Sequence, residues 1–274
     1  MTNAKFEKLA RIVMMSLCAF FFVVAAWGDT RVVHCLKGCP SGANPENDLI
    51  VRELFALSNN RDTKFADWVA YRVTSETIGT SKALQRQWQA DPLLASESTL
   101  EPQDYKDIAK ALGSDRGHQA PMASFTGTVF WRSTNVLSNI TPQKAELNRG
   151  AWLRLETAVR KLAFSRRLVY VVTGPLYGPD LPWLEVDRGM DALHVGPLQL
   201  PNADERHELP VGYWKVVALP HGDVAVFRFD QKTTLTDHCL GMTTLDVLED
   251  RTGLQFFPES QGWPKDDLAK ELGC

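Results

Sequence analysis

The sequence predicts an α+β fold, in which a largely antiparallel central sheet is flanked by helices. The segments with strand and helix patterns do not alternate regularly, as they would in a doubly wound parallel sheet. Two β-rich segments, 213–218 and 224–229, flank His221-Gly222-Asp223 in the manner of a hairpin. With 44% apolar and 23% charged residues, the 274-residue chain has the composition of a globular protein with a sizeable core.

The first 28 residues are predicted to be a secretory signal peptide. A basic segment precedes an apolar run over residues 12–24, and small residues follow at Ala25, Ala26 and Gly28. Cleavage after Gly28 would leave one domain of residues 29–274, because no linker rich in Pro, Gly or Ser divides the rest. It would place the protein in the periplasm or outside the cell, without stable membrane association. The alternative is an uncleaved membrane anchor, since the run is close to the shortest transmembrane length.

Four cysteines follow the leader, and a fifth, Cys18, lies inside it. An even number of cysteines in an exported chain predicts two disulfides. Cys35 and Cys39 are near enough in sequence to close a small loop, and a Cys239–Cys274 bond would then hold the C-terminus. A four-cysteine zinc site is the alternative, although such a site usually has two closely spaced pairs and this chain has one.

Two strands, residues 49–57 and 65–74, are predicted around a turn at 58–62. In the second strand the residue types alternate in a way that suits a sheet with both faces partly covered. A β-branched strand at 168–173 is predicted to end at Gly174-Pro175. A C-terminal helix is predicted over residues 243–252, because Thr243 and Asp246 have capping-box-like spacing and Gly253 is a suitable stop.

A longer helix is predicted to begin near Thr141-Pro142, with Thr as N-cap and Pro as the first helical residue. Counting about 100° per residue, Asn148 falls in the middle of the buried stripe, and Glu156 and Arg160 fall at its edge. A buried amide without partners costs roughly 1–3 kcal/mol. Asn148 is therefore either a structural residue bonded to backbone or a ligand. The predicted stripe consists of Ala151, Trp152, Leu155, Val159, Leu162 and Ala163.

The net charge of −3 does not by itself indicate a nucleic-acid partner. The leader contributes +2, so the mature chain carries −5. Nucleic-acid binding would have to come from a local positive surface. Taken alone, the one local basic cluster is better explained as a solvated helix face. It consists of Arg149, Arg154, Arg160, Lys161, Arg166 and Arg167.

The segment Asp115-Arg116-Gly117-His118-Gln119 carries the clearest chemical pattern in the chain. Downstream lie Asn139, then Asn148 near the start of the long helix and Glu156 about two turns further on. An imidazole, a carboxamide and a carboxylate are the groups needed to hydrolyse a phosphodiester with one hard metal ion. The other five histidines belong to no such pattern: His34, His194, His207, His221 and His238.

These motifs resemble the signature of the DNA/RNA non-specific endonucleases, a family whose core is a ββα-metal finger. The likeness covers nearly the whole mature chain and is greatest to the Serratia-type secreted, sugar-non-specific members, in which the cysteines pair as proposed above. Arg149 stands where those members have a neutral amide, and it would strengthen contact with phosphate. Four further segments resemble the family: residues 64–71, 86–92, 172–177 and 251–254.

The resemblance implies a role for each motif residue. It makes His118 the general base, and Asn148 the protein ligand of Mg²⁺, with Mn²⁺ as a substitute. It makes Glu156 the carboxylate that orders water around the cation, and Arg86 the group that stabilises negative charge on phosphorus. Three further residues, Arg116, Asn139 and Arg160, are implied to support the base, the metal or the phosphate.

The implied function is that of a secreted, metal-dependent endonuclease that hydrolyses DNA and RNA. It would cut single and double strands with little sequence preference and leave 5′-phosphorylated oligonucleotides. Two alternatives stay open: a nucleic-acid-binding module that has lost catalysis, and a phosphodiesterase that acts on another substrate. Homodimers occur in the family, but the sequence indicates no interface.

Overall fold

The computed structural model describes residues 31–80, 84–178, 199–234, 236–260 and 268–274. The predicted signal peptide and its cleavage site lie outside the described residues. From Arg31 to Cys274 the chain forms one unit. None of the helices described is both long enough and apolar enough to cross a membrane.

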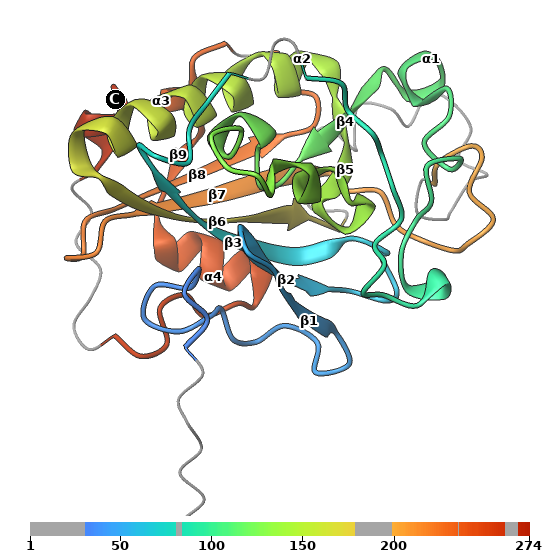
Figure 1. Cartoon of the computed structure of the whole chain (residues 1–274), viewed down its shortest axis with the longest axis horizontal. Helices are drawn as coiled ribbons and strands as arrows, with labels where there is room; N and C mark the ends of the chain where they lie inside the picture. The colour runs from blue at the N-terminus through green and yellow to red at the C-terminus, as the bar shows by residue number, and fades with distance from the viewer. Residues whose placement is uncertain (1–30, 81–83, 179–198, 235, 261–267) are drawn as a thin grey trace, which may run out of the picture. The chain divides into compact units, whose positions relative to one another are not determined.

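A seven-stranded sheet, antiparallel at every pairing, forms the centre of this unit, which confirms the predicted fold class (Figure 1). Its strand order is β1-β2-β3-β6-β7-β8-β9. A second sheet has two strands, β4 and β5, and carries the site described below. The strands of the large sheet are β1 (Asp48–Val51), β2 (Phe55–Asn59), β3 (Ala66–Thr74), β6 (Leu168–Leu176), β7 (Gly212–Ala218), β8 (Val224–Asp230) and β9 (Met242–Thr243).

The two faces of the large sheet bury separate apolar clusters, because successive side chains of a strand point to opposite faces. On β3, Tyr71 belongs to the cluster that includes Trp152 of helix α3 (Ala151–Arg166). Its neighbour Ala70 belongs to the cluster that includes Leu248 of helix α4 (Leu245–Thr252). The sheet is therefore covered by α3 on one face and by α4 on the other (Figure 1).

Several predicted elements are confirmed with small shifts. The second predicted strand is β3, and the predicted hairpin is formed by β7 and β8. The C-terminal helix is α4, but its N-cap is Thr244, whose side chain accepts a hydrogen bond from the backbone N–H of Val247. As predicted, α4 ends at Gly253, which has a φ of 70°. A left-handed residue of this kind is a common helix stop, and glycine adopts it without steric cost.

Two strand predictions were wrong in their limits. The single strand expected at 49–57 is a hairpin of β1 and β2, with Val51 opposite Ala56. The reversal falls at Arg52, whose N–H donates to the Phe55 carbonyl, and no glycine, proline or asparagine marks it in the sequence. Strand β6 does not end at Gly174-Pro175 but continues to Leu176, because Gly174 allows the β3 backbone and the Trp214 indole to approach closely.

The small sheet and the helices that follow it form a ββα unit. Strand β4 (Ser114–His118) pairs antiparallel with β5 (Ile140–Lys144), and β5 leads into α2 (Ala145–Arg149) and α3. The prediction that the helix begins at Thr141-Pro142 was wrong, because both residues lie in β5. The Pro142 carbonyl instead accepts hydrogen bonds from Tyr213 and Gln231, and the helix begins three residues later. A separate short helix, α1 (Ile108–Leu112), precedes β4.

The predicted buried stripe of α3 is confirmed, but the position predicted for Asn148 was wrong. Gly150, with a ψ of −115°, separates α2 from α3, so the two helices do not share one continuous 3.6-residue period. Leu147 is buried in α2, whereas Asn148 is half-buried. The interruption turns Asn148 away from the core and towards a pocket. The buried residues of α3 are Ala151, Trp152, Leu155, Val159, Leu162 and Ala163.

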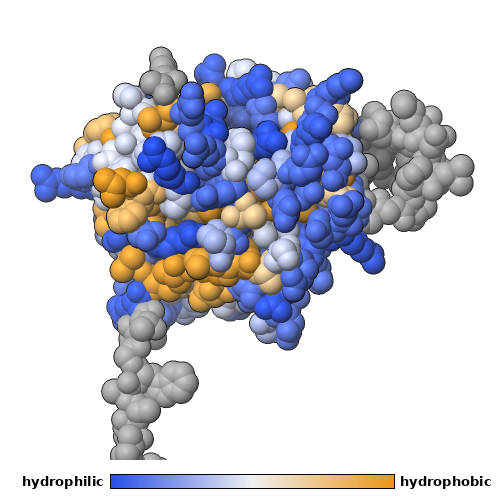
Figure 2. All heavy atoms as spheres, turned by 45° about the vertical axis from the view of Figure 1, so that its right-hand side comes forward, coloured by the Kyte–Doolittle hydropathy of each residue, from blue (hydrophilic) through white to orange (hydrophobic). Residues whose placement is uncertain are grey.

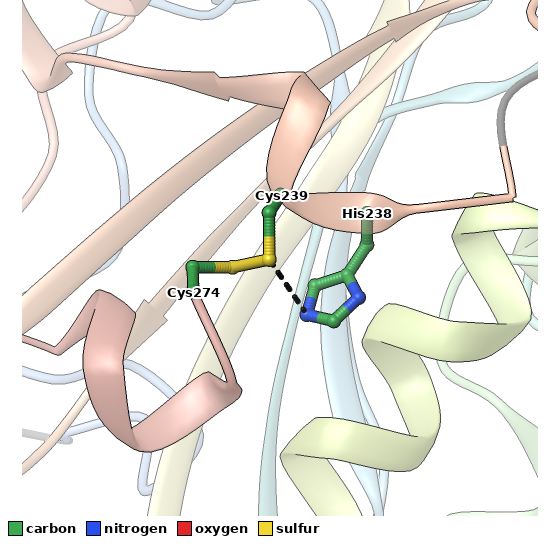
Figure 3. A group of neighbouring side chains, drawn as sticks. All are labelled: His238, Cys239 and Cys274. Atoms are coloured by element: carbon green, nitrogen blue, oxygen red, sulfur yellow. Dashed lines mark hydrogen bonds between the residues drawn. A yellow bond between two sulfur atoms is a disulfide. The ribbon is translucent and has the colours of Figure 1, made fainter.

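Both predicted disulfides are present, Cys35–Cys39 and Cys239–Cys274. The four cysteines that a zinc site would have needed are therefore joined in two separate pairs. Beside the second disulfide lies His238, whose Nε2 is 3.9 Å from the Sγ of Cys239 (Figure 3). The same nitrogen donates a hydrogen bond of 2.9 Å to the Leu272 carbonyl. The disulfide and this bond together hold the C-terminal segment.

Loss of the Cys239–Cys274 disulfide is expected to destabilise the protein more than loss of Cys35–Cys39. The Cys239–Cys274 bond closes a loop with a sequence separation of 35, whereas the Cys35–Cys39 bond closes a loop with a separation of 4. Loop entropy predicts losses of about 4 and about 2 kcal/mol, respectively. Urea unfolding of the two double Cys→Ser variants measures the difference. An equal loss, or a larger loss from the short loop, would show that chain entropy does not govern the effect.

Candidate active site

A pocket of about 660 Å³ brings together five of the seven residues predicted for the site. One comes from the segment before residue 90, and the other four come from β4, α2 and α3 of the ββα unit. The other two predicted residues, Asn139 and Arg160, do not line it. The five residues are Arg86, Arg116, His118, Asn148 and Glu156.

His118 is the last residue of β4 and lies opposite Ile140, the first residue of β5. The preceding residue, Gly117, is required by close packing between the two strands. A Cβ atom at this position would lie 2.7 Å from the Cβ of Gln143, which is closer than such atoms approach. Glycine therefore lets β5 pack tightly against the end of β4 and fixes where His118 leaves the sheet.

Asn135 orients the imidazole of His118 and was not predicted from the sequence. The residue is 1% exposed, ends a 3₁₀ helix (Trp131–Asn135), and places its Oδ1 3.0 Å from Nε2 of His118. With the amide oxygen facing it, Nε2 carries the proton, and Nδ1 keeps a free lone pair. The Trp88 ring also lies 5.4 Å from the imidazole, centroid to centroid. Asn135 belongs to no motif, so only the fold reveals it.

Burial lowers the pKa of His118 to about 4. The hydrogen bond to Asn135 acts in the opposite direction, and the positive charge of Arg86 lowers the pKa further. The imidazole is therefore neutral at physiological pH, which is the state of a general base. Between about pH 4 and the pKa of an unfolded histidine, near 6.5, the unfolded chain binds more protons. This residue's contribution to stability thus increases with pH through that window.

His118 is expected to titrate near pH 4 in the metal-free protein and to carry its proton on Nε2 above that pH. Long-range ¹H–¹⁵N NMR spectra report both the pKa and the tautomer. Asn135→Ala should lower the pKa further, because it removes the bond that favours the charged ring. Asn202→Ala is the control, since that exposed amide bonds to the Lys106 carbonyl. An ordinary pKa near 6.5, or a proton on Nδ1, would contradict this geometry.

Asn139 holds the backbone that follows His118. Its side chain is fully buried, its Oδ1 accepts from the Ala120 N–H at 2.8 Å, and its Nδ2 donates to the Ala120 and Thr134 carbonyls. Thr134 is next to Asn135, which orients the imidazole. The Asn139 amide therefore links the backbone that follows His118 to the backbone beside Asn135. The structure thus places Asn139 behind the pocket, bonded to backbone.

Asn148 lies at the pocket with one end of its amide fixed. Its Nδ2 donates to Asp115 Oδ2 at 2.8 Å, and among the described residues its Oδ1 accepts no hydrogen bond. Asp115 also accepts two hydrogen bonds from the guanidinium of Arg149. Burial acts to raise the pKa of Asp115, but the hydrogen bonds from Arg149 and Asn148 together outweigh it, so the pKa is lowered. Asp115 therefore directs the Asn148 carbonyl oxygen by holding its nitrogen.

Glu156 lines the pocket one helical turn before Arg160. The Nη1 of Arg160 is 3.8 Å from Glu156 Oε2, and its Nη2 donates to Thr157 Oγ1 at 2.9 Å. Burial raises the pKa of Glu156, while the charges of Lys215 and Arg160 lower it. Arg160 thus contacts the pocket only through Glu156.

The two arginines that line the pocket differ in how they are held. Arg86 is exposed, whereas Arg116 is half-buried and donates from Nη2 to the Tyr105 carbonyl at 3.0 Å. The Arg116 guanidinium also lies 5.7 Å from the ring centroids of both Trp88 and Tyr105. Arg116 is therefore a fixed positive charge, and Arg86 is a charge exposed to solvent.

The donors at this pocket fit a hard divalent cation that keeps most of its water. The oxygen of Asn148 could serve as one ligand, and the Asp115 and Glu156 carboxylates line the same pocket. Mg²⁺ suits few protein oxygens plus water. In the described part of the chain, the one close group of three His, Cys or carboxylate ligands is that of His238, whose two sulfurs form a disulfide. The pocket therefore fits Mg²⁺ better than a metal that needs a sulfur or imidazole cage.

Comparison with known proteins identifies relatives over most of the chain. Residues 35–262 match the family model described as DNA/RNA non-specific endonuclease. A nuclease from Serratia marcescens is 43% identical over 250 residues, which is 88% of this chain and 87% of that protein. The mitochondrial nuclease of Saccharomyces cerevisiae is 30% identical over 88% of this chain and 77% of its own.

A solved structure supports the fold. The crystal structure of the EndoG/EndoGI complex, described as showing the mechanism of EndoG inhibition, aligns with a TM-score of 0.64 at 23% identity. The alignment covers 78% of this chain and 87% of the other.

Proposed function

The chain belongs to the DNA/RNA non-specific endonuclease family, which makes it an endonuclease, and we propose that it hydrolyses phosphodiester bonds in both DNA and RNA with the help of a single divalent cation. One observation carries this proposal. The pocket brings together a neutral imidazole, an amide oxygen without another partner among the described residues, and a buried carboxylate.

His118 acts as the general base. Its Nε2 donates to Asn135, so Nδ1 is the atom that takes a proton from the attacking water. Because burial keeps the ring neutral at physiological pH, the base is ready before substrate binds. The Trp88 ring beside it shields one side of the imidazole from bulk water.

Asn148 would hold the cation through Oδ1, and Glu156 would accept hydrogen bonds from water in the same pocket. Mg²⁺ is the proposed ion and Mn²⁺ a substitute, because both take oxygen ligands and tolerate a largely aqueous shell. The family is metal-dependent. When bound, the ion supplies Lewis-acid stabilisation of the charge on the scissile phosphate. The position of the ion would depend on residues of this chain. Asp115 fixes the Asn148 amide, and Arg160 lies beside the Glu156 carboxylate.

Arg86 and Arg116 provide positive charge for the phosphate. Arg86 is exposed and can move onto the substrate, while Arg116 is held in place by Tyr105. Figure 2 shows that hydrophilic side chains predominate on the side of the molecule that carries β4 and β5. These groups contact the backbone and not base edges, which predicts cleavage without sequence preference and strong inhibition by salt. Cleavage of the bond to the 3′ oxygen leaves 5′ phosphates.

A substrate panel tests this function against its two alternatives. Plasmid DNA, total RNA, a synthetic phosphodiester and phospholipid vesicles are incubated with the mature protein and Mg²⁺. We expect loss of DNA and RNA, faster at low salt, and little reaction with the other two. Binding to nucleic acid without cleavage would indicate an inactive binding module. Preferred cleavage of the synthetic ester or the lipid would indicate a different phosphodiesterase.

We further propose that residues 29–274 form one exported domain after cleavage of the leader at residue 28. The two disulfides support export, because such bonds form in oxidising compartments. N-terminal sequencing of protein from periplasm and medium tests this, and a retained Met1 would contradict it. The homodimer expected from the resemblance is tested on the same material by light scattering, where the mass of a single chain would contradict it.

A further inference from the structure

Lys215 of β7 is a buried amine between the large sheet and α3. Its side chain has no exposed surface, and its Nζ donates to Tyr71 Oη at 3.2 Å. The same Nζ lies 4.2 Å from the centroid of the Trp152 ring. For packing alone, an apolar side chain of similar length would serve as well or better, because a buried ammonium loses its hydration. The positive charge is therefore the feature that needs a reason.

Glu156 supplies that reason. Trp152, whose ring contacts Lys215, is one helical turn before Glu156 on α3, so Lys215 lies on the sheet side of the same stretch of helix, although no contact of 4.0 Å or less joins its Nζ to the carboxylate. Lys215 is the largest of the charges that lower the pKa of Glu156, ahead of Arg160. Conversely, Glu156 raises the pKa of Lys215, which burial lowers to about 7. The two groups therefore act on each other through their charges, without a direct ion pair.

The charged groups around this pair come from three elements. Arg160 lies on α3 with Glu156, Lys215 lies on β7, and Tyr71 lies on β3 with a pKa that burial raises. Strand β6 separates β3 from β7 in the sheet and presents the uncharged residues Val169, Val171 and Thr173. Two basic side chains thus accompany one carboxylate at this position.

We propose that Lys215 is a positioning residue for the reaction, which supplies positive charge to the Glu156 carboxylate from the sheet side of α3. Arg160 performs the same task from the edge of the helix. An ionised Glu156 accepts two hydrogen bonds per oxygen from pocket water, whereas a protonated one presents a donor that disrupts that arrangement. This inference rests on the proposed function, because it assigns Lys215 a part in the same site.

The test compares Lys215→Met with wild type over a range of pH, using cleavage of a DNA duplex with Mg²⁺. We expect kcat at neutral pH to decrease about tenfold with KM nearly unchanged, since the substitution removes a transition-state contribution and no substrate contact. Removing the cation raises the pKa of the carboxylate, so the acidic limb of the kcat profile should move up by about one pH unit. Lys270→Met is the control, because Lys270 is exposed.

A double-mutant cycle with Glu156→Gln separates positioning from packing. If Lys215 acts through Glu156, Lys215→Met should lower kcat in the wild-type background and have little effect in the Glu156→Gln background. Thermal unfolding of the same four proteins measures the interaction of Lys215 with Glu156 without reference to cleavage. The decrease in Tm caused by Lys215→Met should be smaller in the Glu156→Gln background than in the wild-type background. If Lys215→Met does not fold, Lys215→Gln removes the charge and keeps a donor for Tyr71.

The outcomes distinguish this inference from the proposed function. A wild type that cleaves neither DNA nor RNA would overturn the proposed function, whatever the unfolding cycle shows. An active wild type in which Lys215→Met leaves the pH profile in place, or lowers kcat equally in both backgrounds, would overturn the role of Lys215 alone.

Discussion

Replacing His118 by alanine is expected to lower the rate of DNA and RNA cleavage by about 10³- to 10⁴-fold. General-base catalysis contributes about 10²- to 10⁴-fold, and the described residues that line the pocket include no other imidazole. The lowered pKa of His118 shows that the ring is available as a base across the physiological range. Single-turnover cleavage of one duplex, with enzyme in excess, measures the chemical step directly.

The control for this variant is His221→Ala. His221 bonds to Asp223 and does not line the pocket, so its loss should leave the rate unchanged within about twofold, as for an ordinary surface substitution. Circular dichroism and binding of the duplex should be the same for wild type and His118→Ala, because the histidine is not needed to hold the phosphate. Cleavage by His118→Ala within tenfold of wild type would mean that another group is the base.

Replacing Asn148 by alanine is expected to remove cation binding and to lower cleavage on the order of 10³-fold. The Asn148 oxygen is the protein ligand proposed for the ion, and a divalent cation supplies several kcal/mol of charge stabilisation in such reactions. Titration of Mn²⁺ followed by electron paramagnetic resonance measures binding without reference to activity. Higher Mg²⁺ should restore part of the rate if the defect is one of affinity.

Asn44→Ala is the matched control, since that exposed side chain accepts only from the Glu46 N–H and lies outside the pocket. A second variant, Arg149→Gln, removes the main partner of Asp115 and leaves Asn148 in place. It should weaken Mn²⁺ binding by less than Asn148→Ala. Unchanged Mn²⁺ affinity in Asn148→Ala would show that the ion is held elsewhere.

The chemistry of the site could be predicted from the sequence because its groups belong to motifs. His118, Asn148 and Glu156 stand at fixed spacings, and the structure places all three at one pocket. The amphipathic stripe of α3 could also be predicted, because burial of one helix face gives the apolar residues of the sequence a period of 3.6. Short-range patterns of this kind are visible along a single chain.

What could not be predicted depends on contacts between distant segments. Asn135 is 17 residues from His118 and becomes its partner only when a 3₁₀ helix packs against the end of β4. Pro142 has the local pattern of a helix start, but pairing with β4 puts it in a strand. Lys215 looks like one residue of an ordinary strand until the sheet and α3 enclose it beside Glu156.

The most direct test of a single cation-dependent site is the Mg²⁺ dependence of cleavage for two oligonucleotide duplexes of one sequence, one of DNA and one of RNA. We predict that the mature protein cuts both, that the two rates increase over the same range of Mg²⁺ concentration, and that EDTA stops both. All products should carry 5′ phosphates. Cleavage of one sugar only, or cleavage that persists in EDTA, would contradict a site that acts on the phosphate backbone through one bound cation.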